Sequence, residues 1–275
     1  MSPWMSQSWV LALVLSVMAH LLADFPFQNN DVAAHKGSSN RHLLEHGLWI
    51  FGVFCVVLTP FAGLLVAALF AAVQMVTHLL IDRLKVQFTA KALTVKDEAW
   101  TARPAVFSLL DQLLHLGVIL ASFRALGVLV PNWADGGNGL SKAIEALTGL
   151  PAGAGLSAAL LVALGMILLL VNGWFGRYTI DQLVNPHKEP PKAGEPLHGA
   201  AIGVVERLLI VGLVLVGHWE GIAGILVVKT IARFGEFSGD GGRRFAEQFI
   251  LGTLTSVALA VFSATLVRWL ILGVV

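Results

Sequence analysis

Residues 61–82 read FAGLLVAALFAAVQMVTHLLID, and this stretch decides the fold class. Gln74 and Thr77 are its only polar residues before His78. A membrane-spanning helix needs about 20 predominantly apolar residues, and the stretch reaches that length before it ends at Asp82. The sequence therefore predicts a transmembrane helix here, with His78 and Asp82 four residues apart at one end.

The rest of the chain has the same apolar character. Of its 275 residues, 56% are hydrophobic and 13% are charged, and the mean hydropathy is +0.78. Soluble domains average about 25% charged residues. We therefore expect an all-α, polytopic transmembrane helical bundle.

Charge and cysteine content exclude two classes of function. The 18 Lys and Arg residues against 17 Asp and Glu residues leave a net charge of +1, so no basic excess is available to neutralise a nucleic-acid backbone. Nucleic acid is not expected as a partner. The single cysteine, Cys55, excludes a disulfide framework and a thiol metal site.

Apolar runs that end at charges, prolines or glycine clusters predict about eight spans. They cover residues 9–25, 43–58, 61–81, 105–126, 156–175, 200–216, 221–234 and 249–270. The seventh is short, so the sixth and seventh runs are alternatively a re-entrant pair. The first run has no positively charged start and no small-residue cleavage site, and we expect it to be a retained helix.

The loops divide the expected bundle and orient it. A Gly- and Pro-containing stretch predicts a four-helix front half over residues 1–130, an extracytoplasmic linker over 131–155 and a four-helix back half over 156–275. Lys and Arg residues gather in the odd-numbered loops. Because positive charges accumulate in cytoplasmic loops, both termini are expected to face outward.

Ionisable residues interrupt the first four spans in a regular pattern. Three pairs of His and Asp residues are each four positions apart, which places the members of a pair on one helix face. With one further histidine in the second span, the candidate ligands are His20, Asp24, His46, His78, Asp82, Asp111 and His115. Because the helices alternate in direction, all seven are expected at one depth near the cytoplasmic surface.

Several carboxylates facing one another in apolar surroundings need compensation. A divalent cation provides it, with zinc the default and iron or manganese as alternatives. Seven groups exceed one tetrahedral shell. Either two metals bind, or some of the groups orient the ligands or act as a general base, a role expected for Asp24 or Asp111.

The pairs of His and Asp residues set the order in which we expect the candidates to be metal ligands. His78, Asp82, Asp111 and His115 come first, then His20 and Asp24, and last His46. The alternative without a metal is a buried polar or ion-pair network among the same residues.

A second cluster, in the back half, is cationic. Arg207, Lys229 and Arg233 are predicted to hold a phosphate or carboxylate group of a substrate. The alternative is structural pairing of these cations with Glu206 and Glu247.

The motifs resemble a known family. Residues 20–28 (HLLADFPFQ), His46, His78-x-x-x-Asp82 and Asp111-Gln-x-x-His115 resemble the bacterial membrane proteins grouped as domain of unknown function 3307. Later motifs look like the longer members of that group: Gly203-x-x-Glu206-Arg207, Lys229-x-x-x-Arg233-Phe234 and Gly252-Thr253. The resemblance implies a bacterial inner-membrane location, and it implies neither a reaction nor a ligand.

These patterns favour a membrane-embedded, metal-dependent hydrolase that opens to the cytoplasmic side. Its partner is expected to be a membrane lipid or an amphiphilic small molecule with an ester, amide or phosphoester bond, and Gln28 is a further candidate for contact with this substrate. Two alternatives stay open: a transporter of metal ions or protons, and a non-catalytic sensor or assembly protein. A homo-oligomer is also left open.

Overall fold

The computed structural model describes residues 7–28, 39–93, 103–130, 133–185, 198–238 and 242–274. Every regular element in these ranges is helical. The α-helices are α1 (Gln7–Asp24), α3 (Asn40–Leu93), α4 (Arg103–Leu129), α5 (Gly137–Thr148), α6 (Gly155–Leu170), α7 (Gly176–Val184), α8 (His198–Val216), α9 (Glu220–Ala232) and α10 (Gly242–Val274). Short 3-10 helices cover Trp133–Gly136 and Phe234–Ser238, and a π-helical turn, η4, covers Val171–Phe175.

Five helical stretches in the described part of the chain are long and apolar enough to cross a membrane. They are Gln7–Asp24, Asn40–Phe88, Ala105–Leu129, Gly155–Val184 and Gly242–Leu272. The described part of the chain is therefore all-helical, and its long apolar helices are typical of a membrane protein. The number of spans and the side on which each terminus lies stay predictions.

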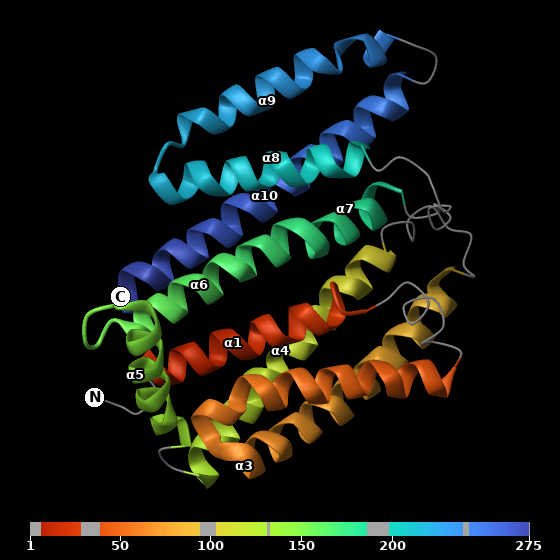
Figure 1. Ribbon diagram of the computed structural model, residues 1–275. Helices are drawn as coiled ribbons and strands as arrows, with labels where there is room; N and C mark the ends of the chain where they lie inside the picture. The colour runs from red at the N-terminus through yellow and green to blue at the C-terminus, as the bar shows by residue number, and fades with distance from the viewer. Residues whose placement is uncertain are drawn as a thin grey trace. The chain divides into compact units, whose positions relative to one another are not determined.

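The runs expected as the second and third spans are the two arms of α3, which folds back on itself (Figure 1). The turn contains Pro60, which has no backbone N–H to continue the helical ladder. It also contains Gly63 at φ 72° and ψ 164°, a conformation almost restricted to glycine. His46 and His78 lie at nearly equal distances from this turn, so the antiparallel arms bring them to one depth.

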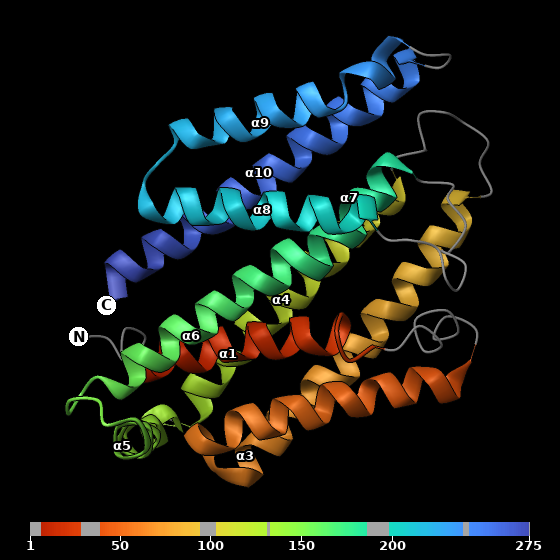
Figure 2. The same ribbon diagram turned by 45° about the horizontal axis from the view of Figure 1, so that its top comes forward.

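Helix α1 packs between two other helices. It packs against α3 on one side and α6 on another, as both ribbon views show (Figures 1 and 2). Ala12, Ala19 and Ala23 are fully buried in these contacts. Small side chains let helix backbones approach closely, and close packing is the main source of helix association in a membrane.

Aromatic side chains hold the end of α1 that lies farthest from Asp24. The Trp9 ring packs edge-on against Phe123 of α4 and against Trp133, with centroid distances of 5.3 and 5.4 Å. Phe70 of α3 also contacts Phe123. Edge-to-face ring pairs of this kind add to the packing energy, so α1, α3 and α4 are held together at this end.

The described part of the chain divides into two compact units. Unit 1 contains the described residues up to Leu93 and those of 106–170, and the main segment of unit 2 begins at Val171, in the π-helical turn η4. Helix α5 packs on α6 and α6 packs on α1, all within unit 1. The front half, linker and back half expected from the sequence stay predictions.

Candidate metal centre

Four side-chain atoms of unit 1 converge at the end of α1. The Asp24 Oδ1 atom lies 3.1 Å from His46 Nε2 and 3.0 Å from His78 Nε2. The two imidazole nitrogens are 3.0 Å from each other. Asp82 Oδ2 completes the group, at 3.5 Å from His46 Nε2 and 3.7 Å from His78 Nε2. All four residues are buried, and His46 has no exposed surface.

Five of the six separations among these four atoms are close to those of a tetrahedral coordination shell. Ligand atoms about 2.0–2.2 Å from a zinc ion lie roughly 3.3–3.6 Å apart at the corners of a tetrahedron. The five distances given above, from 3.0 to 3.7 Å, bracket that length. Two imidazoles and two carboxylates are also a donor set that suits zinc, iron or manganese. The residues present therefore fit a metal ion.

The Gln112 side chain links this group to two neighbouring candidates. Its amide nitrogen donates to Asp24 Oδ2 at 3.1 Å and to Asp111 Oδ2 at 3.3 Å. Its amide oxygen lies 3.1 Å from His20 Nε2. An amide oxygen only accepts hydrogen bonds, so His20 donates from Nε2. With Gln112 in this orientation, His20 Nε2 acts as a hydrogen-bond donor and helps to position the cluster.

Asp111 and His115 form the side of the cluster contributed by α4. The Lys85 ammonium group donates to Asp111 Oδ2 at 2.7 Å, while Asp111 Oδ1 is buried without a hydrogen bond. Both ring nitrogens of His115 are also buried without a hydrogen-bond partner. Buried polar atoms are normally satisfied, and an exception needs an explanation such as an ion or a water molecule.

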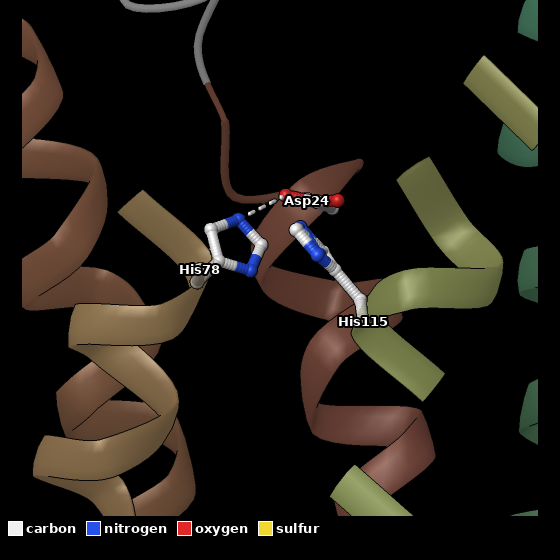
Figure 3. A group of neighbouring side chains, drawn as sticks. All are labelled: Asp24, His78 and His115. Carbon is white, nitrogen blue, oxygen red and sulfur yellow. Dashed lines mark ion pairs between the residues drawn. The ribbon is translucent and has the colours of Figure 1, made fainter. Parts of the chain in front are cut away.

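The His115 ring faces His78 at a centroid distance of 4.0 Å, and Asp24 lies beside both rings (Figure 3). Asp24, His78 and His115 offer ligand atoms within 4.8 Å of one another, and so do Asp82, Asp111 and His115. A second group of potential ligands therefore adjoins the first and shares Asp82 with it.

A small cavity adjoins the imidazoles. Its volume is about 10 Å³, and its walls include His20, His78, His115 and the apolar side chains of Ile50 and Phe54. A cavity needs roughly 10–15 Å³ to hold one water molecule. The space beside the three imidazoles is therefore at the size of a single water.

The structure buries all seven His and Asp candidates and joins them by short contacts within unit 1. Helices of alternating direction bring them together, and their depth in the membrane stays a prediction. His46, which sequence spacing ranked last, makes short contacts to both Asp24 (3.1 Å) and His78 (3.0 Å). No distance in the structure tests which of the seven bind a metal, and those roles stay predictions.

Sequence reasoning missed two residues of the cluster, Lys85 and Gln112. Lys85 lies among the Lys and Arg residues of a loop expected on the cytoplasmic side. The structure instead pairs it with Asp111, and the two residues come from different helices. Gln112 carried a usable signal, because it directly follows Asp111 within the motif. A polar side chain beside a buried carboxylate is a natural candidate for orienting that carboxylate.

The three cationic candidates of unit 2 are engaged separately. Lys229 contacts Glu206, which is the structural pairing kept as the alternative. Arg233 pairs with Glu236 at 2.7 Å on an exposed surface. Arg207 is buried and donates to the backbone oxygen of Asn172. The described residues therefore show these cations in three separate contacts.

Two further candidates have simpler positions. Gln28 is half-buried and lies just beyond α1, and residues 29–38, which follow it, are outside the described ranges. Glu247, the other proposed partner of the cations, pairs with Arg243 on the surface of α10 at 3.1 Å.

The fold and the site define a helical protein of the membrane type with a buried His and Asp cluster. Residues 12–138 match the family model described as "Protein of unknown function (DUF3307)". The matched residues include all seven candidate ligands, so the similarity covers the part of the chain that forms the cluster. The comparisons with curated proteins and with solved structures gave no match.

Proposed function

We propose that this chain is a membrane-embedded, metal-dependent hydrolase whose substrate is lipid-like or otherwise amphiphilic. The observation that carries the proposal is the convergence of four buried ligand atoms from Asp24, His46, His78 and Asp82, with five of their separations between 3.0 and 3.7 Å. We take zinc as the metal, because its preferred ligands and distances agree with this group.

Charge supports the presence of a cation. Asp24, Asp82 and Asp111 are all buried at less than a tenth exposure, and Lys85 is the cation that contacts one of them. Buried carboxylates without compensation are costly in apolar surroundings. A divalent ion at the four-atom group balances two of the three carboxylates, and Lys85 balances the third.

Each residue has a role in the proposed reaction. The bound metal lowers the pKa of a coordinated water toward about 7 and polarises the scissile bond. Asp111, whose Oδ1 atom has no hydrogen bond, accepts the proton of the attacking water. Gln112 and Lys85 hold Asp111 in place through its other oxygen. His115 faces His78 from α4 and is available as a ligand or a proton acceptor.

The surplus of ligands also supports a hydrolytic centre. A structural zinc site is closed by four protein ligands, whereas a catalytic site has three protein ligands and a water molecule, so a hydrolytic centre here would use three of these side chains and leave the fourth position to water. Asp111 and His115 adjoin the four-atom group and share Asp82 with it in a second triad. That arrangement accommodates a water molecule or a second ion, as two-metal hydrolases require.

Transport of a metal ion or of protons is the second candidate. One observation favours it: Glu206 and Arg207 lie near the middle of α8, a run expected to span the membrane, and ionisable residues inside a membrane are typical of transport pathways. The described residues around the His and Asp cluster line only a small cavity, and a transport route would have to continue beyond it.

Two measurements on the purified full chain test the proposal. Elemental analysis should find zinc in the wild-type protein and a loss of most of it in His46→Ala and His78→Ala. His218→Ala is the matched control, because His218 is exposed and far along the chain in unit 2. Wild-type protein without bound divalent metal, after purification without chelators and reloading with zinc, would contradict the metal centre.

The second measurement separates hydrolysis from metal binding alone. Asp111→Asn keeps the shape of the side chain and removes its basicity. We expect it to keep its zinc and to lose about 10²–10⁴-fold in turnover of amphiphilic ester, amide or phosphodiester reporters in proteoliposomes. Zinc flux across the proteoliposome membrane without turnover of any reporter would instead establish transport.

A further inference from the structure

A polar cluster around Arg207 lies in unit 2, near the middle of α8 and α10 and in the π-helical turn η4. Arg207 is halfway along α8, Asn172 is in the π-helical turn between α6 and α7, and Ser256 is near the middle of α10. All three side chains are buried, with Arg207 only 3% exposed. A polar group at mid-helix in an apolar bundle is costly, and its usual explanation is function.

The neutral contacts of Arg207 do not balance its charge. Its Nε donates to the backbone oxygen of Asn172 at 2.6 Å, and its Nη1 donates to Ser256 Oγ at 3.3 Å. Among the described residues no carboxylate forms an ion pair with Arg207, and the adjacent Glu206 is paired with Lys229. The hydrogen-bond partners of the buried guanidinium group are therefore neutral, and no carboxylate in the described ranges touches it.

One end of the guanidinium group has an unsatisfied hydrogen-bond donor. The Nη2 atom of Arg207 is buried without a hydrogen-bond partner. Together with Nη1, whose contact to Ser256 is long, it presents the two-pronged end that binds both oxygens of a carboxylate or phosphate.

Two glycines let the backbone pack closely against the guanidinium group of Arg207. A Cβ atom at Gly203 would lie 3.5 Å from Nη1, and one at Gly176 would lie 3.1 Å from Nε. The π-helical turn at Val171–Phe175 disturbs the regular backbone ladder at the point where Asn172 accepts from Arg207. Single π-helical turns inside α-helices occur frequently at functional sites.

We propose that Arg207 is the anchor of an anion-binding site in unit 2, with the Ser256 hydroxyl as a second contact, for a ligand that carries a phosphate or carboxylate group. The ligand satisfies Nη2 and neutralises the buried charge. This site is independent of the metal centre in unit 1. The same oxyanion chemistry is presented by a free anion and by an anionic lipid headgroup.

The test uses the full chain in nanodiscs of phosphatidylcholine. Its thermal unfolding is measured at rising concentrations of inorganic phosphate or acetate. Potassium chloride is the control for ionic strength. A ligand that binds only the folded state raises the unfolding temperature with concentration. We expect this stabilisation in the wild type, with an apparent affinity at least about tenfold lower in Arg207→Lys, which keeps the charge and loses the planar fork.

A second arm identifies the source of the anion. Stabilisation by phosphate or acetate in phosphatidylcholine supports a soluble ligand. Stabilisation that appears only in nanodiscs containing phosphatidylglycerol, and that Arg207→Lys removes, supports a lipid headgroup. Arg243→Gln is the matched control, because Arg243 is exposed and paired with Glu247, and it should respond like the wild type.

Two results would overturn the proposal. One is a wild-type protein that neither free anions nor phosphatidylglycerol stabilise beyond the chloride control. The other is an equal response in wild type and Arg207→Lys. If Arg207→Lys does not fold, Ser256→Ala replaces it, because it keeps the guanidinium and removes one contact. An unchanged affinity in Ser256→Ala would then count against the site.

Discussion

At the scale of single residues, Lys85 explains how the cluster is balanced on the α4 side. Its ammonium group contacts Asp111 at 2.7 Å, and the Asp111 side chain is almost completely buried. Removing one partner of a buried pair leaves the other charge uncompensated, which is more costly than the pair itself is stabilising. Lys85 is partly exposed, so the loss is moderated by water on its side.

We predict that Lys85→Met lowers the free energy of unfolding of the metal-free protein, prepared with a chelator, by about 1–3 kcal/mol. The reason is that Asp111 is left buried without its cation. The loss should be smaller with zinc bound, since the ion balances the same group of carboxylates. Thermal unfolding followed by tryptophan fluorescence, with and without a chelator, measures both values. Lys142→Met is the control, because Lys142 is exposed on α5. An equal loss with and without zinc would show that no cation shares the cluster.

At the scale of elements, the turn inside α3 sets the register of its two arms. The position of Pro60 and the backbone angles of Gly63 determine where the chain reverses. His46 and His78 then meet at one depth, and a shift of the turn by one residue would rotate each arm by about 100°. The geometry of the cluster therefore depends on a turn at the far end of the hairpin.

Gly63→Ala is predicted to cost about 1–3 kcal/mol, because alanine does not readily adopt φ 72° and ψ 164°. Gly52→Ala is the matched substitution within the first arm, where a Cβ atom meets nothing within 4 Å. It should be neutral or stabilising by up to about 1 kcal/mol. The two unfolding temperatures in the same detergent give the comparison. Equal changes in unfolding temperature for the two substitutions would mean that a side chain at position 63 does not strain the turn.

The sequence predicted the elements better than their connections. Apolar runs ending near Leu58 and starting at Phe61 located both arms of α3, because a membrane helix must be apolar over its whole length. The π-helical turn at Val171–Phe175 was not predicted, since nothing in an apolar run distinguishes an α turn from a π turn. The pairing of Lys85 with Asp111 was also missed, because it depends on the distance between two helices.

At the scale of the whole molecule, the site and the boundaries of the units were predicted to different degrees. The seven His and Asp residues could be grouped from four-residue spacing and from alternating helix direction, which are properties of the chain itself. The boundary of the units could not, because it depends on α6 packing against α1. A Gly- and Pro-rich stretch resembles a linker whether or not the helix beyond it packs back on the first unit.

The predicted orientation of the chain has a direct test in unit 1. In a Cys55→Ser background, Lys142→Cys lies on the side expected to face outward, and Arg41→Cys lies on the side expected to face the cytoplasm. Both positions are exposed. A membrane-impermeant maleimide added to intact spheroplasts should label Lys142→Cys at once and Arg41→Cys only after permeabilisation. The reverse pattern would place the His and Asp cluster at the outer surface.

The central claim is that His46 and His78, with Asp24 and Asp82, hold a metal ion. X-ray absorption at the zinc edge on the loaded full-length protein tests it most directly. We predict a first shell of nitrogen and oxygen atoms at about 2.0–2.2 Å without sulfur, with outer-shell scattering from two imidazoles that falls to one in His46→Ala. A zinc spectrum without imidazole scattering, or one that His46→Ala leaves unchanged, would contradict the account.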